Sequence, residues 1–180
     1  MGDLSIVLAS ERDIDRVMTL VAACIDDMRS AGIEQWDDVY PDRQMMLQDA
    51  RDGSLYLASV DQEPLVGTLV VNDVQSPEYL DVPWTVTGDR IAVVHRLMID
   101  PRYQGRGIAR ELMRFAEQRA AALGCDCVRL DAYSKNPRAL ELYHRLGYHD
   151  AGSVTFRKGV FRCFEKRLAA ADTIGIRRPS

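Results

Sequence analysis

The chain has 180 residues, a formal net charge of −4 and 47% hydrophobic residues, which suits one domain around a single core. The negative net charge argues against nucleic acid as a partner, because such binding rests on a basic surface. No apolar run approaches the ~18 residues of a membrane-spanning helix, and the N-terminus lacks the charged-then-apolar order of a signal peptide. We therefore expect a cytoplasmic protein with no membrane partner.

The first third of the chain begins with a predicted strand and two predicted helices. Residues 4–8 are typical of a strand, and residues 10–13 resemble a capping box that opens a helix. Gly32 is a plausible stop for that helix. Pro41 can occupy the first turn of a second helix, which we expect to run to about Arg51.

Two connectors are candidates for a binding site. The first holds Trp36 and Tyr40, which either cover the edge of the core or contact a ligand. The second is the long polar connection over residues 74–90, which follows an antiparallel hairpin predicted over residues 54–60 and 65–73. Loops of that length in compact domains are usually functional or disordered, so this one is a second candidate.

The most informative stretch is an apolar run followed by a glycine-rich turn. Residues 91–99 are rich in β-branched side chains and predict a strand buried on both faces. Pro101 ends the strand, and Gly105 and Gly107 let the backbone turn into a helix that begins at Ile108. The free N–H groups and the positive dipole end of such a helix can hold a diphosphate. An ordinary strand-to-helix turn is the alternative; the pattern fits neither a P-loop nor a dinucleotide fingerprint.

The last third of the chain completes a parallel strand-helix-strand unit and closes with a hairpin. The expected strand, helix, strand and strand cover residues 127–133, 136–145, 148–156 and 160–168. This order of elements predicts an α+β domain over residues 1–168, built on one mixed sheet with flanking helices. Residues 169–180 are expected to form a loosely ordered C-terminal tail.

The cysteines show no spacing typical of a zinc site. They are Cys24, Cys125, Cys127 and Cys163. We expect reduced packing residues, with Cys125 and Cys127 projecting from one face of the same strand. A catalytic thiol is a minor alternative, because none of them has a histidine neighbour in the sequence.

Two segments resemble the GNAT superfamily of N-acetyltransferases. Gln104-Gly105-Arg106-Gly107-Ile108-Ala109 matches its Gln/Arg-x-x-Gly-x-Gly/Ala signature and follows a strand that ends in apolar-x-apolar-Asp-Pro, as in that family. Residues 136–148 are similar to its Asn-x-x-Ala-x-x-x-Tyr-x-x-x-Gly-Phe segment, with Tyr148 in place of the phenylalanine. Two motifs in the right order and spacing are far more specific than one.

The resemblance implies the GNAT fold, with α/β/α layers and a mostly antiparallel sheet whose central parallel strand pair is splayed. The pantetheine arm of acetyl-CoA enters that gap, and no metal is required. By the resemblance, the backbone of Leu97, Met98 and Ile99 pairs with the arm. The pyrophosphate is expected on the backbone amides of Gln104, Gly105, Arg106, Gly107, Ile108 and Ala109. Asn136 either contacts the cofactor or caps its helix.

The implied reaction is direct attack of a primary amine on the thioester, through a tetrahedral intermediate. Tyr143 matches the general acid that protonates the departing thiolate, and its alternative role is core packing. His95 is the candidate general base; the alternatives are a structural histidine, or a water relay to Glu34 or to an acidic loop residue.

The acceptor is expected to be an amine of a small molecule or a peptide. Trp36, Glu34 and Tyr133 are the candidate residues that bind it. The competing function is a non-catalytic acyl-CoA-binding or sensor module of the same fold. Exposed sheet edges make a homodimer plausible.

Overall fold

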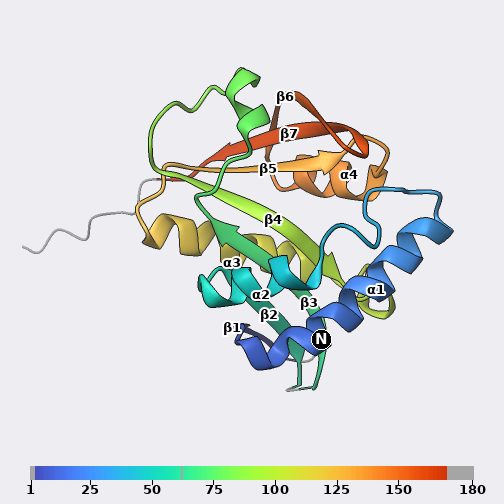
Figure 1. The fold of residues 1–180 in the computed structure, drawn as a ribbon. Coiled ribbons are helices and arrows are strands. Elements are labelled where there is room, and N and C mark those ends of the chain that lie inside the picture. The colour runs from blue at the N-terminus through green and yellow to red at the C-terminus, as the bar shows by residue number, and fades with distance from the viewer. Residues whose placement is uncertain (1–2, 62, 170–180) are drawn as a thin grey trace, which may run out of the picture.

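A mixed seven-stranded sheet forms the middle layer of the protein, in the order β1-β2-β3-β4-β5-β7-β6 (Figure 1). The computed structural model describes residues 3–61 and 63–169. The strands are β1 (Leu4–Leu8), β2 (Leu55–Val60), β3 (Glu63–Asn72), β4 (Ile91–Ile99), β5 (Cys127–Tyr133), β6 (His149–Phe156) and β7 (Gly159–Arg167). The α helices are α1 (Ile14–Ser30), α2 (Arg43–Arg51), α3 (Ile108–Ala122) and α4 (Pro137–Arg145), and the 3-10 helices are η1 (Glu11–Asp13), η2 (Pro77–Asp81) and η3 (Pro101–Tyr103).

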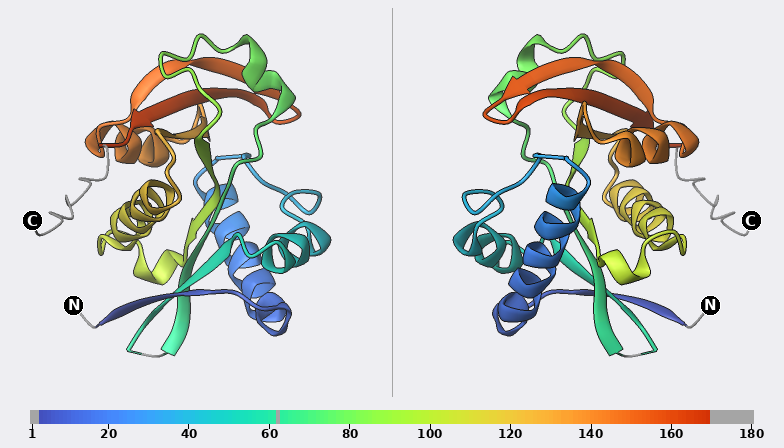
Figure 2. Two further views of the ribbon diagram at one scale, coloured as in Figure 1. Left: turned by 90° about the vertical axis from the view of Figure 1, so that its left-hand side faces the viewer. Right: turned by 90° about the vertical axis from the view of Figure 1, so that its right-hand side faces the viewer.

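The helices cover the sheet on both sides. Figure 2 shows α1 and α2 on one side of the sheet and α3 and α4 on the other. Leu112 of α3 and Tyr143 of α4 share a buried cluster with Leu130 of β5, whereas Val21 of α1 and Met46 of α2 belong to a second cluster. The predicted α/β/α layers are therefore confirmed, and each of these helices buries the apolar stripe that its sequence shows.

The sheet opens between its two parallel strands. All other neighbouring strands pair antiparallel, but β4 and β5 pair in parallel only at Ile91↔Cys127, Ala92↔Val128 and Val93↔Arg129. Beyond these positions β4 continues beside β3, and β5 continues beside β7. The two strands diverge there (Figure 1), which confirms the predicted splayed pair.

A β-bulge in β4 lies just beyond the opening. Val70 pairs with His95 and Thr68 with Met98, so β4 uses one residue more than β3 over this stretch. Arg96 sits in the bulge with a φ of 48°, and its Nη2 lies 2.7 Å from Asp49 Oδ1 of α2. Their side chains are only 9% and 11% exposed, and this buried ion pair attaches the bulge to α2.

The long connection over residues 74–90 is fastened to the sheet by two buried charged residues. Arg129 of β5 donates to Val86 O at 2.6 Å and to Gln75 Oε1 at 2.6 Å. Glu165 of β7 accepts from the backbone N–H and the hydroxyl of Thr85, at 2.7 and 2.6 Å. The connection is thus held over β5 and β7 by charge-assisted hydrogen bonds.

Most of the predicted elements are present with nearly the predicted bounds. The expected start of the second helix is wrong: α2 begins at Arg43, and Pro41 precedes its N-cap. Asp42 is that N-cap, because its carboxylate accepts from Met45 N at 2.8 Å. The expectation that Cys125 and Cys127 project from one face of the same strand is also wrong, since Cys125 precedes β5 and only Cys127 lies in it.

The remaining expectations concern the ends of the chain and the membrane. Apart from Ala169, the predicted tail over residues 169–180 lies outside the described residues. None of the helices in residues 3–61 and 63–169 combines the length and the apolar character that crossing a bilayer demands.

Gly67 allows β3 to lie close to the bulged strand, and enlarging it is expected to destabilise the fold. A Cβ at this position would lie 2.8 Å from Met98 O and 2.9 Å from Ile99 Cδ1. Because the first of these is a backbone atom, β4 must shift. We expect Gly67→Ala to lower the free energy of unfolding by about 1–3 kcal/mol and Gly67→Val by more, measured by denaturant titration. A parent-like value for the valine variant would contradict this close approach.

Candidate active site

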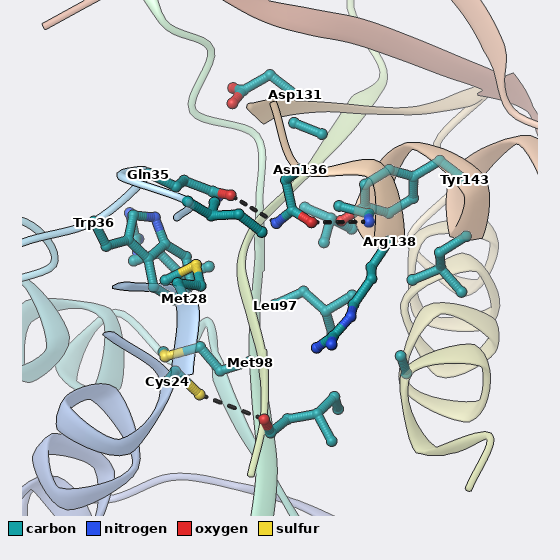
Figure 3. Close-up of a pocket in the computed structure, with 18 of the residues that line it drawn as sticks. Cys24, Met28, Gln35, Trp36, Leu97, Met98, Asp131, Asn136, Arg138 and Tyr143 are labelled. Carbon is teal, nitrogen blue, oxygen red and sulfur yellow. Dashed lines mark hydrogen bonds between the residues drawn. The ribbon is translucent and has the colours of Figure 1, made fainter. Parts of the chain in front are cut away.

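A cavity of about 1320 Å³ occupies the opening between β4 and β5. Its walls come from α1, the connector between α1 and α2, the connection over residues 74–90, β4, the turn into α3, β5, α4 and the β6–β7 turn. Figure 3 shows Trp36 and Met28 on one side of β4 and Tyr143 on the other, with Leu97 between them. The cavity therefore joins the two faces of the sheet through the gap in it.

The N-terminus of α3 forms one end of the cavity. Gly107 is the N-cap, has a φ of 83° and makes no side-chain cap hydrogen bond. Gly105 also has a positive φ, and a Cβ there would meet no atom within 4 Å. The lining includes Gln104, Gly105, Gly107, Ile108 and Ala109. First-turn N–H groups without a side-chain cap, beside a cavity, suit an anionic group such as a diphosphate.

Arg106 differs from the other residues of this turn. Its guanidinium lies 4.9 Å from the ring centre of Tyr103, and Arg106 is not among the residues that line the cavity. Its backbone amide is the candidate contact for a phosphate. The cation–π contact instead holds the arginine against the turn.

The edge of β4 forms the floor of the cavity. Leu97, Met98 and Ile99 all line it, and β4 has no strand partner on the β5 side beyond Val93. The Met98 side chain packs in the cluster that holds residues of α1 and α2, so this residue offers mainly its backbone. A strand edge without a partner can pair with an extended ligand as an added strand does.

Tyr143 projects from α4 into the cavity lining (Figure 3). It is 6% exposed, and its ring packs against Tyr148 and Phe164, with centroid distances of 5.9 and 5.6 Å. Its hydroxyl is not among the fully buried polar atoms that lack a partner in the described residues, and Tyr143 lines the cavity. Burial and the negative charge of Asp131 raise the pKa of Tyr143, so the phenol stays protonated and can donate a hydrogen bond.

The match to a family of known proteins decides the assignment of this site. The model of the acetyltransferase (GNAT) family matches residues 19–148. This chain belongs to the GNAT family. The fold of a GNAT acetyltransferase from Streptococcus agalactiae is similar, with a TM-score of 0.80, 25% identity, and coverage of 92% of this chain and 96% of that chain.

Two further GNAT-fold structures resemble the chain at lower identity. A GNAT family acetyltransferase from Listeria monocytogenes has a TM-score of 0.74 and 21% identity, and covers 92% of this chain and 95% of its own. An acetyltransferase of Salmonella typhimurium, solved with its cofactor acetyl-CoA, has a TM-score of 0.68 and 18% identity, with coverage of 96% and 99%. At these identities, the two similarities show a shared fold and nothing more.

Asn136 acts as a helix cap in this GNAT site. Its Oδ1 accepts from Ala139 N at 3.2 Å, and its Nδ2 donates to Gln35 Oε1 at 2.9 Å (Figure 3). Of the two roles considered for Asn136, capping is the one whose contacts are present. The same side chain also fixes the connector between α1 and α2 against α4.

His95 lines the cavity but is a weak base. Its Nε2 lies 3.0 Å from Asn72 Oδ1 and 3.1 Å from Val74 O, and Asn72 Oδ1 also accepts from Val74 N at 3.0 Å. Because both partners of Nε2 are acceptors, we assign the proton to this nitrogen. Burial and the charge of Arg96 lower the pKa of His95 to about 4. An imidazole of that pKa suits the role of general base poorly at neutral pH.

Of the three candidate acceptor-binding residues, one lines the cavity and two do not. Trp36 is buried and lines the cavity. Glu34 is exposed and Tyr133 packs against Phe161 with a centroid distance of 5.2 Å, and neither is among the lining residues. The neighbour of Glu34, Gln35, faces the cavity instead, and the water relay to Glu34 therefore loses its basis.

Sequence reasoning missed Asp131 and its partner Tyr79. The Tyr79 hydroxyl of η2 donates to Asp131 Oδ2 at 2.7 Å, and both residues line the cavity. Burial raises the pKa of Asp131. Only one signal in the sequence points to Asp131, which stands among apolar residues at the end of a predicted strand. Burying a charged group there costs free energy unless the group is paired.

A second missed feature links the connector of α1 and α2 to the β6–β7 turn. Asp37 accepts from Arg157 at 2.7 and 2.9 Å and lies 3.2 Å from Lys158 Nζ. The hydrogen bonds from Arg157 hold the pKa of Asp37 well below its usual range. Arg157 and Lys158 line the cavity. Within the described residues, no group of three or more His, Cys, Asp or Glu side chains is placed to hold a metal ion.

Proposed function

We propose that this GNAT family member is an enzyme that transfers the acetyl group of acetyl-CoA to a primary amine of a small molecule or a peptide. One observation carries the proposal. The unpaired edge of β4 runs through a cavity that ends at the uncapped N-terminus of α3 and is also lined by Tyr143. The Salmonella structure, solved with acetyl-CoA, supports this choice of co-substrate.

The cavity suits a long, phosphate-bearing ligand at one end and an extended arm at the other. Backbone amides from Gln104 to Ala109 would hold the pyrophosphate, and the edge of β4 from Leu97 to Ile99 would pair with the arm. Acetyl-CoA supplies the thioester, which the amine attacks directly through a tetrahedral intermediate. Fixing both reactants in one cavity can supply about 7–11 kcal/mol of barrier reduction through proximity and orientation.

Groups of this chain are placed to stabilise the negative charges that develop on the oxyanion and on the departing sulfur. An N–H on the unpaired edge of β4 is suited to stabilise the oxyanion, because a donor fixed by the backbone needs no reorganisation as the charge develops. Tyr143 donates its hydrogen bond to the departing sulfur. The competing function, an acyl-CoA sensor without turnover, gives no role to a phenol that lines the cavity and can donate a hydrogen bond there.

Acetyl-CoA binding and thiol release test the proposal together. We expect isothermal titration to show one acetyl-CoA site per chain. A panel of primary amines is then expected to include at least one that releases free coenzyme A faster than the protein without an amine. Binding without amine-dependent thiol release would favour the sensor. A homodimer and a cytoplasmic location stay predictions from the sequence.

A further inference from the structure

Asp131 occupies the point where the sheet opens. It lies two residues beyond Arg129, the last residue of β5 that pairs with β4. Its neighbours Leu130 and Ala132 belong to the cluster that includes residues of α3 and α4, so strand alternation directs Asp131 to the opposite face. Figure 3 shows its carboxylate on the side of the cavity where Gln35 and Trp36 lie. This is the face from which an acceptor reaches the gap, if the phosphates lie at α3.

The carboxylate of Asp131 lacks a cationic partner within the described residues. Its Oδ2 accepts from Tyr79, and no hydrogen bond of Oδ1 and no ion pair with lysine, arginine or histidine is found in the described part of the chain. Burial raises its pKa. Asp131 is half-buried, and an ionised carboxylate in such a position is stabilised when a positive group pairs with it. The free Oδ1 therefore suits a cation that arrives with a ligand.

The walls around this carboxylate are apolar and largely aromatic. The lining residues on this side include Met28, Ile33, Trp36, Tyr40, Phe156 and Phe161. Phe156 and Phe161 pack edge to face with a centroid distance of 5.1 Å. Aromatic faces attract a cation and also bury an apolar body. The walls thus favour an ammonium group on an apolar or aromatic frame.

The β6–β7 turn limits the number of charges that the ligand can carry. Arg157 and Lys158 both pair with the one carboxylate of Asp37. These three side chains therefore carry a net charge of about +1 on this wall of the cavity. A second ammonium on the ligand would be repelled there. A monoamine fits the cavity better than a polyamine.

We propose that Asp131 Oδ1 receives the ammonium group of the acceptor and removes one of its protons, and that the acceptor is a single primary amine on an apolar or aromatic body. This inference rests on the proposed acetyltransferase function and names the acceptor class for that site. It gives the role of general base to Asp131 in place of His95.

The proton transfers balance. One ammonium N–H bond breaks, its electron pair stays on nitrogen, and the proton moves to Asp131 Oδ1. The free amine forms the C–N bond to the thioester carbon, and the C–S bond then breaks with its electron pair on sulfur. The nitrogen gives its second proton to the Tyr143 phenol oxygen as the phenol proton passes to the thiolate, so the phenol is restored. Asp131 returns its proton to solvent, and each turnover releases one proton.

Several groups around Asp131 set the pH range in which it can act. The hydrogen bond from Tyr79 favours its ionised form, and the charge of Glu78 on η2 disfavours it. Tyr143 faces it from α4, Cys163 lies opposite on β7, and His95 lies on β4. Loss of the Tyr79 hydroxyl raises the pKa of Asp131. We therefore expect Tyr79→Phe to move the acidic limb of kcat/KM to higher pH.

The decisive binding experiment compares a charged ligand with its neutral counterpart. Benzylamine and benzyl alcohol are titrated into the protein saturated with coenzyme A, which allows no turnover. The parent is expected to prefer benzylamine at least about tenfold, and Asp131→Asn, which keeps an acceptor for Tyr79, is expected to lose this preference. Asp81→Asn on η2, which is exposed and outside the cavity lining, is the matched control and should keep it.

The matching kinetic experiment separates this inference from the proposed function. With acetyl-CoA and benzylamine at neutral pH, Asp131→Asn is expected to lower kcat/KM at least about 100-fold without changing the acetyl-CoA affinity. A parent-like rate and an unchanged ammonium preference would overturn the assignment of Asp131 and leave the enzyme intact. Loss of the preference in Asp131→Asn, with no thiol release by the parent for any amine, would uphold the ammonium site and reject the enzyme. Equal binding of the two ligands by the parent also overturns the inference.

Discussion

Gly107→Glu is expected to weaken acetyl-CoA binding at least about a thousand-fold, equal to about 4 kcal/mol. Gly107 is the N-cap of α3 with a φ of 83°, and a Cβ there would lie 3.3 Å from Arg110 Nη2. The new carboxylate would stand at the helix end that is expected to hold the pyrophosphate, and would also compete for Arg110. Repulsion between two anions at a helix N-terminus reverses the interaction that the dipole provides. Isothermal titration measures the loss.

The control for this variant separates backbone strain from charge. Gly53 also has a positive φ, of 66°, and a Cβ there would meet no atom within 4 Å. Gly53→Glu carries the same unfavourable backbone conformation at a position outside the cavity lining. It is expected to lower the melting temperature and to leave the acetyl-CoA affinity unchanged. Undiminished affinity in Gly107→Glu would show that the phosphates bind elsewhere.

The parts of the fold that the sequence predicts well are those with strong local signals. The β-branched run and Pro101 give the bounds of β4 as Ile91–Ile99, and the Gly-x-Gly turn gives the start of α3 at Ile108. Both hairpins follow from turn residues between strand-like runs. The splayed pair is different, because no local pattern in β4 or β5 predicts it; it follows from the resemblance to the GNAT superfamily.

The features that were missed depend on contacts between distant residues. Asp131 and Tyr79 are 52 residues apart in the chain, and the bulge at Arg96 depends on an ion pair with Asp49, 47 residues away. Periodicity alone carries no information about such pairs. The sequence predicts Glu34 at the cavity, but Gln35 faces it instead. The cause of this error is simpler, since a connector without regular structure gives no rule for which side chain faces inward.

His95 and Asp131 both line the same cavity, and the sequence favours His95 over Asp131 as a base. An unperturbed histidine has a pKa near ~6.5 and an unperturbed aspartate near ~3.9, which favours histidine. Burial shifts the two pKa values in opposite directions, because it disfavours the charged form of each group. It lowers the pKa of His95 and raises that of Asp131. Burial therefore makes His95 a weaker proton acceptor and Asp131 a stronger one than each would be in water, which agrees with the role we propose for Asp131.

Tyr143→Phe is expected to lower the rate of thiol release roughly 10- to 100-fold and to leave the acetyl-CoA affinity within about twofold. A phenol with an ordinary pKa of ~10 is already a weaker acid than a thiol with ~8.5, and burial and the charge of Asp131 raise the pKa of Tyr143 further. Complete proton transfer to the thiolate is thus uphill. The benefit is a hydrogen bond to the developing negative charge on sulfur, worth about 1.5–3 kcal/mol, which corresponds to this range of rates.

A second buried tyrosine provides the control for the loss of a hydroxyl. Tyr56 of β2 packs edge to face on Phe115, with a centroid distance of 4.8 Å, and is outside the cavity lining. Tyr56→Phe is expected to keep the parent rate of amine-dependent thiol release. If Tyr143→Phe also turns over at the parent rate while both variants bind acetyl-CoA normally, the hydroxyl makes no contact with the leaving sulfur. In that case Tyr143 serves only to pack α4 against β5 and β7, and water must protonate the thiolate.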